Sequence, residues 1–508
     1  MIKLNKATMA RVLFLFVVSG LTFSCERKNE GMPVVDLPEM APDVMFTALT
    51  DDNRVVKYQA RNLDSPVEIL DISGLPDSEM IISIDYRPAT GQLYALGSSS
   101  RLYIINENSG VATALGINSF SPAISGENAS IDFNPTVDRI RLVTESGQNL
   151  RLHPELGTVV ATDGNINGGM NPKIGAVAYT NSVAGTTMTT LYDIDFEGDK
   201  LFIQTPPNDG GLQEVGDLKI NIKGMGDFDI NPDNSSALLV AIENNQSRLF
   251  SVDLASGRAK WVGKFKMPII GIAFKTNPVA YAANCDNEFF RFNPLSPSEN
   301  KINLVGMMAE EYIVGLDFRP INGALYAITN KSRLLTVNTS NGQVTPIGSG
   351  LNPMLSGTTF GFDFNPTVDR IRLVSNTAQN LRLHPDLGSV VFNDGNLKPG
   401  SPMVNGAAYN NSFAGSTNTT LYVLDSETDM LYMQVPPNDG VLVPVGSLGI
   451  NFKDENGFDI GGASNSAFAH LKVGDMSAIY TINLSTGAAT KISDFNVHVT
   501  AMALGLGF

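Results

Sequence analysis

Short apolar runs that alternate with polar residues and end at Gly, Asn or Ser fill most of the chain. After Asp85 the sequence runs GQLYALGS, SRLYIINENSG and VATALG, and after Asp317 it runs GALYAITN, SRLLTVNTSNG and QVTPIG. A period of two is typical of half-buried β-strands, and the Gly, Asn and Ser residues mark turns between them. No interval carries a sustained 3.6-residue apolar period with caps, so we expect an all-β protein with few helices.

A four-residue mark recurs along the chain, in which a strand ends in Asp, an aromatic or aliphatic residue, one free position and Pro. With degenerate copies, which start with Ala or, at Asp459, lack the Pro, the marks begin at Asp85, Asp132, Ala178, Asp229, Ala273, Asp317, Asp363, Ala408, Asp459 and Ala503. Successive marks lie between 44 (317 − 273) and 51 (229 − 178) residues apart, and each interval holds four predicted strands. Four-stranded units at this spacing are typical of β-propeller blades, so we expect about ten of them.

The two ends of this pattern complement each other. The final predicted strand, Val499–Leu504, has none after it, and the first three, Val44–Leu49, Arg54–Tyr58 and Val67–Leu70, lack an innermost strand. Pairing the two ends would close one ten-bladed ring. Alternatively, Ile269–Phe274 completes the first half of the chain and Val499–Leu504 the second, which gives two five-bladed propellers. We expect the two propellers, because propellers typically have four to eight blades.

A long duplication supports a division into two domains. The segment DFNPTVDRIRLV begins at Asp132 and returns unchanged at Asp363, and QNLRLHP begins at Gln148 and returns at Gln379. Both pairs have the same offset of 231 residues (363 − 132 and 379 − 148). The chain of 508 residues also exceeds the roughly 250–300 residues at which a single hydrophobic core stops growing.

The duplicated core also resembles a known family. The order NPTVDRIRLV, QNLRLHP and DGN, followed by TTLY and PPNDG, is similar to the bacterial domain-of-unknown-function family 4394. Two tandem copies would form propeller-like repeat domains over residues 44–275 and 276–508. The resemblance implies a secreted or surface-anchored propeller-like domain, and it implies no established activity.

The N-terminal segment has the pattern of an export signal. Basic residues precede an apolar run, Val12–Leu21, that is too short to act as a stop-transfer helix. We expect residues 1–24 to be a signal peptide and Cys25 to be lipidated, as in bacterial lipoproteins; conventional secretion is the alternative. Residues 25–43 are then a flexible tether, which places the protein in the cell envelope outside the cytoplasm. Cys285 is the only other cysteine, and we expect it to be a small buried apolar residue.

The main candidate site is a pair of charged strands in each copy. Alternation gathers the charged side chains of each strand on one face. These are Arg139, Arg141, Asn149, Arg151 and His153 in the first copy, and Arg370, Arg372, Asn380, Arg382 and His384 in the second. They could form an anion or carboxylate pocket, because guanidinium offers a planar fork. We expect instead that the arginines pair with Asp132, Asp138 and Asp163 between blades, since buried Arg is usually paired with acid.

Three further motifs have weaker functional interpretations. Asp163 and Asp394 each begin an Asp-Gly-Asn segment and are weak candidates for cation ligands, but Asp-Gly and Gly-Asn favour hairpin turns. The repeated PPNDG segment predicts a rigid turn before the last strand of a blade. The Asp that begins each mark could line a central channel, although we expect its carboxylate to cap the turn made by the following Asn-Pro.

The net charge and the absence of known catalytic motifs exclude several classes of function. The formal net charge of −16 argues against nucleic-acid binding, which needs basic residues. The chain has four His, no His-x-x-Glu-His or Gly-x-Ser-x-Gly motif and no paired cysteine ligands, so no catalytic residue is assigned. We predict a lipid-anchored binding or scaffold module for an unknown protein, glycan or small anionic ligand, with no cofactor.

An enzyme remains the alternative. A propeller hydrolase or lactonase would hold a cation such as calcium with oxygen ligands from several inner strands. It should bring three or more carboxylates together at one mouth, whereas a binding module should show an exposed aromatic or apolar patch.

Overall fold

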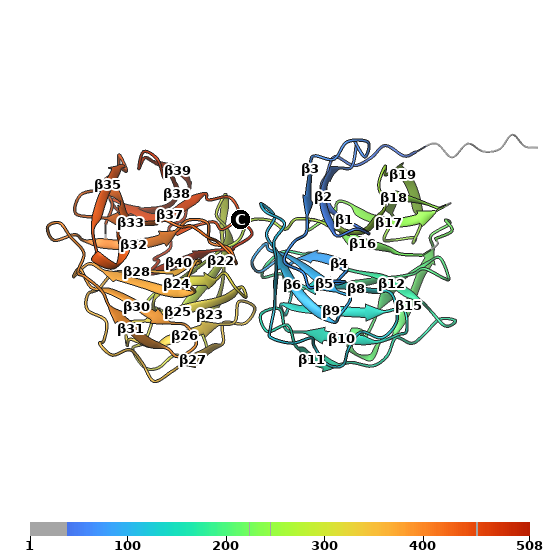
Figure 1. The fold of residues 1–508 in the computed structure, drawn as a ribbon, viewed down its shortest axis with the longest axis horizontal. Helices are drawn as coiled ribbons and strands as arrows, with labels where there is room; N and C mark the ends of the chain where they lie inside the picture. The colour runs from blue at the N-terminus through green and yellow to red at the C-terminus, as the bar shows by residue number, and fades with distance from the viewer. Residues whose placement is uncertain (1–37, 223, 244, 454–455) are drawn as a thin grey trace, which may run out of the picture. The chain divides into compact units, whose positions relative to one another are not determined.

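The computed structural model describes residues 38–222, 224–243, 245–453 and 456–508. The predicted signal peptide, the lipidation site Cys25 and most of the predicted tether lie outside these residues. Within them the protein is all-β, with ten four-stranded antiparallel sheets (Figure 1).

Five sheets are built from the first half of the chain, residues 45–273. Its strands are β1 (Met45–Thr50), β2 (Arg54–Gln59), β3 (Glu68–Asp71), β4 (Ile81–Tyr86), β5 (Leu93–Gly97), β6 (Arg101–Ile105), β7 (Ala112–Ala114), β8 (Ala129–Asn134), β9 (Arg139–Thr144), β10 (Asn149–Leu152), β11 (Val159–Thr162), β12 (Ile174–Tyr179), β13 (Leu191–Asp195), β14 (Lys200–Gln204), β15 (Leu212–Asp217), β16 (Gly226–Ile230), β17 (Ala237–Glu243), β18 (Gln246–Val252), β19 (Ala259–Lys264) and β20 (Ile269–Ala273).

The other five sheets are built from the second half, residues 280–504. Its strands are β21 (Ala280–Ala283), β22 (Glu288–Asn293), β23 (Ser296–Asn303), β24 (Ile313–Arg319), β25 (Ala324–Thr329), β26 (Leu334–Val337), β27 (Val344–Ile347), β28 (Phe360–Asn365), β29 (Arg370–Ser375), β30 (Asn380–His384), β31 (Ser389–Asn393), β32 (Val404–Tyr409), β33 (Leu421–Asp425), β34 (Met430–Gln434), β35 (Leu442–Ser447), β36 (Asn456–Ile460), β37 (Ala467–Val473), β38 (Met476–Ile482), β39 (Ala489–Asp494) and β40 (Ala501–Leu504).

The first sheet of each half is completed by the last strand of that half. The first sheet has the order β20-β1-β2-β3, with Leu49 opposite Gly271, and the corresponding sheet of the second half has the order β23-β22-β21-β40, with Ala283 opposite Ala501. A single ten-sheet ring would need β40 beside β1. The structure instead pairs β40 with β21 and β1 with β20, so the two ends of the chain do not pair with each other.

The inner strands of each half lie next to one another in chain order. In the first half β4 contacts β8, β8 contacts β12, β12 contacts β16, β16 contacts β20, and β20 contacts β4. In the second half the same cyclic order runs through β24, β28, β32, β36 and β40. Each inner strand therefore has a neighbouring inner strand on both sides.

The core lies between neighbouring sheets, which explains the change of sequence pattern from inner to outer strands. Inner strand β12, with the sequence IGAVAY, is buried at every position, whereas outer strand β3, with EILD, alternates between half-buried and exposed. A strand covered on both faces tolerates a continuous apolar run, and an edge strand needs polar residues on its free side. Between the second and third sheets of the first half, for example, Leu96, Ile131 and Leu142 pack in one buried cluster.

The only helices in the described chain are two three-residue 3₁₀ turns, Pro207–Asp209 and Pro437–Asp439. They lie inside the PPNDG segments and precede β15 and β35, the last strands of their sheets, as the sequence predicts. Within the described residues, no helix has the length and apolar character needed to cross a membrane.

Candidate functional site

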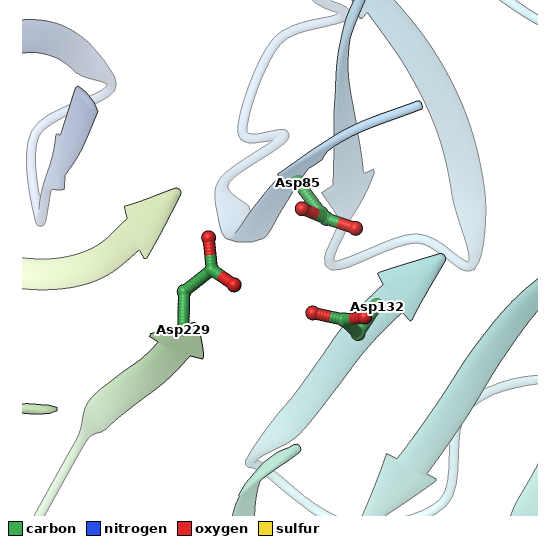
Figure 2. Close-up of side chains that lie close together, drawn as sticks. All are labelled: Asp85, Asp132 and Asp229. Atoms are coloured by element: carbon green, nitrogen blue, oxygen red, sulfur yellow. The ribbon is translucent and has the colours of Figure 1, made fainter. Parts of the chain in front are cut away.

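Three carboxylates meet at the centre of each half. In the first half Asp85 on β4, Asp132 on β8 and Asp229 on β16 point toward one another (Figure 2). One oxygen from each lies within 4.8 Å of the others, and the three residues are only 2–6% exposed. The second half repeats the arrangement with Asp317, Asp363 and Asp459, on β24, β28 and β36. We call these clusters the first and second Asp triads.

Each triad arises from the recurring marks. Five inner strands end at equivalent positions near the centre of each half, and the first half has Asp at three of them and Ala178 and Ala273 at the other two. The second half has Ala408 and Ala503 at the matching places. The order of Asp and Ala is therefore the same in both halves.

Backbone amides hold the triad carboxylates in place. Oδ1 of Asp85 accepts a hydrogen bond from the amide of Tyr86 on its own strand (2.7 Å), and Oδ2 accepts one from the amide of Phe133 on β8 (2.7 Å). Asp132 likewise accepts from the amide of Tyr179 on β12 (3.1 Å), and Asp229 accepts from the amide of Phe274 after β20 (2.5 Å). Each carboxylate therefore joins its own sheet to the next.

The second triad makes the same links. Asp317 accepts from the amide of Phe364 (2.6 Å), Asp363 from that of Tyr409 (3.0 Å) and Asp459 from that of Leu504 (2.6 Å). The sequence-based expectation that these aspartates cap the following turn is wrong. In the first half Asn134 performs that task, since its Oδ1 accepts from the amide of Thr136 (3.0 Å).

Burial and mutual repulsion disfavour three bare negative charges in one triad. Burial raises the pKa of Asp85 and Asp132 well above the usual range, and the neighbouring carboxylates raise it further. Burial raises the pKa of Asp229 to about 7, and the same holds for Asp459 in the second triad. A proton or a cation therefore stabilises the cluster.

Two residues before the third aspartate of each triad, the two halves differ. In the first half Asp227 lies two residues before Asp229 on β16, and its Oδ1 accepts a hydrogen bond from the hydroxyl of Ser130 (3.0 Å). Asp227 is 3% exposed, and its Oδ2 has no hydrogen-bond partner in the described chain. The matching residue in the second half is Gly457, which lines a narrow cavity together with Gly315, Gly361, Gly406 and Ala501.

Two arginines of the charged strand pair donate hydrogen bonds to one aspartate of the same sheet. Arg141 donates to Oδ1 of Asn149 (2.7 Å), to Oδ2 of Asp163 (2.7 Å) and to Oδ1 of Asn208 (2.8 Å), and Arg151 donates to both oxygens of Asp163 (2.8 and 2.9 Å). The second half reproduces these contacts with Arg372, Asn380, Asp394, Asn438 and Arg382. In both halves two guanidiniums thus converge on one buried carboxylate.

The remaining candidates of the strand pair contact other groups. Arg139 donates to the carbonyl of Asp138 (2.7 Å), and Nδ1 of His153 accepts from the amide of Glu155 (3.2 Å). The carboxylate of Asp138 pairs with Arg87 of the preceding sheet (2.5 Å). Arg370 and His384 make the corresponding backbone contacts, with the carbonyl of Asp369 (2.8 Å) and the amide of Asp386 (3.2 Å).

The Asp-Gly-Asn segments do not form the hairpin turns that the sequence suggested. After β11 the chain continues without a turn, and the amide of Gly164 donates to the carbonyl of Asn208 in the neighbouring PPNDG segment (2.9 Å). The ion pairs of Asp163 with Arg141 and Arg151 fix the segment to its own sheet, and Arg141 also donates to Asn208 of that neighbour. A tertiary contact therefore overrides the local turn preference, and the two weak metal candidates, Asp163 and Asp394, have arginine partners.

A cavity of about 340 Å³ opens on the second half, which sequence reasoning did not predict. It is lined by Cys285, Tyr312, Val314, Thr358, Thr359, Phe360, Asn405, His498, Val499 and Thr500. Cys285 is exposed rather than buried, because it lies in the turn between β21 and β22, and its Sγ is 3.8 Å from Nδ1 of His498. The buried hydroxyl oxygen of Thr359 has no hydrogen-bond partner among the described residues.

The first half has different residues at the matching positions. With the local repeat offset of 230 residues, Asn405 corresponds to Gly175, Ser426 to Phe196 and Thr500 to Ile270 (405 − 175, 426 − 196, 500 − 270). The ring of Phe196 lies so close to Gly175 that a Cβ there would be 2.5 Å from it, and it also lies against Gly226. An aromatic ring thus covers this end of the first half, and a serine stands in its place in the second.

These differences are visible in an internal alignment of the two copies, although no single motif marks them. A strand pattern predicts which residues face inward, but it does not predict whether a loop side chain covers the end of the axis. The signal that could have located the cavity is the loss of Phe and the gain of Asn and Thr in the second copy.

Comparison with known proteins identifies the repeat but not an activity. Residues 54–273 and 288–505 each match a family described as "Domain of unknown function (DUF4394)". A search of the curated proteins finds no match. One similar solved structure is an extracellular domain described as part of a hybrid two-component system from B. thetaiotaomicron, with 11% identity, a TM-score of 0.26, and coverage of 91% of this chain and 72% of that chain.

Proposed function

Because the chain belongs to the DUF4394 family, whose description gives no activity, we propose from the site itself that it is a binding module. Its ligand is a small polar molecule, and the binding site is the 340 Å³ cavity of the second half. That cavity is the observation that carries the proposal, since ligand pockets typically measure about 300–1,000 Å³.

The lining indicates the chemistry of the ligand. Tyr312 and Phe360 offer aromatic surface, whereas Asn405 and Thr359 offer hydrogen-bonding groups. The hydroxyl oxygen of Thr359 has no partner in the described chain, and a ligand could satisfy it. The described lining contains no Lys, Arg, Asp or Glu. An uncharged polar ligand therefore fits this cavity better than the small anion expected from the charged strands.

The scaffold in this proposal is a pair of five-bladed propellers. The strand pairing within each half, the cyclic order of its inner strands and the aspartate links between sheets all support this arrangement. Propellers commonly bind ligands near the axis at one end, where loops from several blades meet.

The proposed location is the bacterial cell envelope, outside the cytoplasm. The export pattern of residues 1–24 and the cysteine at position 25 support a lipid anchor. A hydrolase is less well supported, because the triad carboxylates are buried rather than gathered at an open mouth.

The test is to close the cavity with the side chains of the first half. The double variant Asn405→Gly/Ser426→Phe transfers the Gly175–Phe196 pair, which already fits the equivalent place. We would screen the full chain by thermal shift against neutral sugars, amino acids and nucleosides, and measure hits by calorimetry. We expect a ligand that binds the wild type and binds the double variant at least tenfold more weakly.

The control is Met170→Ser, which changes a 99% exposed side chain of the first half and should leave binding unchanged. Circular dichroism and the melting temperature show whether the double variant is folded. Equal binding by the folded double variant and the wild type would show that the cavity is not the site.

A further inference from the structure

We propose that the first half holds one hard divalent cation of the calcium class on its axis, coordinated by Asp85, Asp132 and Asp229, with Asp227 as an additional oxygen donor. This site is separate from the cavity of the second half and does not depend on the binding function proposed for it.

The first argument is the geometry of the oxygen atoms. Oxygens from the three triad carboxylates all lie within 4.8 Å of one another. Calcium–oxygen distances are about 2.3–2.6 Å, so ligands on opposite sides of the ion lie about 4.6–5.2 Å apart. The triad oxygens can therefore surround one ion without a large rearrangement. All donors are oxygens, which is the ligand type that hard cations prefer.

The second argument is that the donors are fixed before an ion arrives. The three aspartates lie on β4, β8 and β16, not on loops, and backbone amides from neighbouring strands orient their carboxylates. Each carboxylate oxygen has two lone pairs and can accept an amide hydrogen bond while it also coordinates a cation. Pre-oriented donors lose little conformational entropy on binding.

The third argument is independent of the triad and comes from Asp227. Its Oδ2 is buried and has no hydrogen-bond partner in the described chain. A Cβ added to Gly271 on inner strand β20 would lie 3.6 Å from this oxygen. Besides burial, the charge of Asp227 raises the pKa of Asp85 and Asp132, so this carboxylate lies close to the triad. Burial raises the pKa of this carboxylate, and the amide of Ile272, which lies near it, lowers the pKa. A buried carboxylate oxygen without a donor is costly, and a cation on the axis would supply the missing partner.

The fourth argument is the lack of compensating positive charge. No hydrogen bond or ion pair recorded for the described chain joins a Lys or Arg to Asp85, Asp132, Asp227 or Asp229. By contrast, the buried carboxylates of Asp138 and Asp163 both have arginine partners. Some buried carboxylates of the first half thus have a cationic side chain beside them, whereas the triad and Asp227 have none among the described residues.

The second half provides an internal comparison. It has an equivalent triad, but Gly457 stands where the first half has Asp227. With one carboxylate fewer, the second triad should bind a divalent cation more weakly. We therefore expect one tight site per chain, in the first half.

The experiment uses the full chain after treatment with EDTA and removal of the chelator. Calcium binding is measured by calorimetry and by metal analysis after dialysis, and terbium luminescence provides a second readout. We expect one calcium ion per chain, a higher melting temperature in calcium, and affinity at least tenfold lower in Asp227→Asn. The variant Asp363→Asn, in the second triad, is the matched control and should retain the tight site.

Two results would overturn the proposal. One is that calcium, magnesium and manganese neither bind the wild type nor raise its melting temperature, which would mean that protons alone neutralise the triad. The other is that Asp363→Asn abolishes the tight site while Asp227→Asn keeps it. Asp227 is outside the triad, so its substitution tests the site even if triad variants fail to fold.

Discussion

At the scale of single residues, the aspartates and arginines of this chain show how one residue type acquires different tasks from its surroundings. Asp132 accepts a hydrogen bond from a backbone amide of the next sheet, and Asp163 accepts hydrogen bonds from two guanidinium groups. One carboxylate oxygen of Asp227 has no hydrogen-bond donor in the described chain. All three are buried or nearly so, and their sequence neighbours do not distinguish them. The difference comes from the strand that lies opposite each side chain.

His153 gives a prediction at this scale. Its pKa is lowered from 6.5 to about 4. Burial is the largest cause, the charges of Arg139 and Arg87 also lower the pKa, and the charge of Asp138 raises it. Between pH 6.5 and 4 the unfolded chain binds a proton that the folded chain does not, so this histidine makes the free energy of unfolding fall as the pH falls. Below about pH 4 the effect levels off.

His153→Gln should remove that contribution. We expect the free energy of unfolding of the variant to fall less steeply between pH 6.5 and 4, by at most about 1.4 kcal/mol per pH unit. Denaturant titrations of both proteins at pH 7, 6 and 5 measure the difference. Parallel pH profiles would contradict the low pKa, which NMR titration of the four histidines tests directly.

At the scale of elements, the strand pair β9–β10 makes ion pairs with the end of its own sheet and a hydrogen bond to the next sheet. Arg141 and Arg151 lie opposite each other in register, and both bind Asp163, while Arg141 also reaches Asn208 in the following PPNDG segment. The contact explains why PPNDG and Asp-Gly-Asn recur together in both copies. Within each copy, the Asp-Gly-Asn segment supplies the carboxylate that binds the arginine, and the PPNDG segment supplies the Asn that accepts its other hydrogen bond.

Asp163→Asn tests these ion pairs. The side chain of Arg141 is 2% exposed, and loss of its carboxylate partner leaves a buried charge poorly compensated. Breaking a buried pair in this way typically costs about 3–5 kcal/mol, so we expect the melting temperature to fall by several degrees. Arg139→Gln is the control, since Arg139 donates to the carbonyl of Asp138 and not to Asp163, and a similar loss in both variants would argue against the ion pair.

At the scale of the whole molecule, strand pairing connects the ends of each half. The inner strand β40 belongs to the sheet of β21, so residues near the C-terminus complete the second half. Removal of β40 exposes an edge of β21 and removes one of the five inner strands that hold the second half together.

A chain that stops at His498 should therefore lose the second half selectively. We expect limited trypsin digestion to degrade residues after about 280 rapidly and to leave a resistant fragment that contains residues 45–273. Mass spectrometry of the fragments measures this. Equal loss of both halves would show that the halves do not fold separately.

The sequence was sufficient for the strands and the four-stranded units, because the strand period, the turns and the ten marks all describe local geometry. It left open which strand completes the first sheet of each half, since one ring and two separate halves use the same strands. It also located the aspartates of the triads but not their task, since the choice between capping a turn and binding the next strand depends on tertiary contacts. The cavity could not be predicted from the sequence for the same reason. Whether Phe196 or Ser426 covers an axis depends on how a loop folds over two strands, which a strand pattern does not contain.

The completion of the first sheet by β20 has a consequence for synthesis. Every strand of the first five sheets lies before residue 274, so the first half can finish folding while the second is still being synthesised. If the two chain ends instead paired in one ring, the N-terminal sheet would lack its inner strand until the last residues were synthesised. Sequential completion shortens the time during which bare strand edges face other chains.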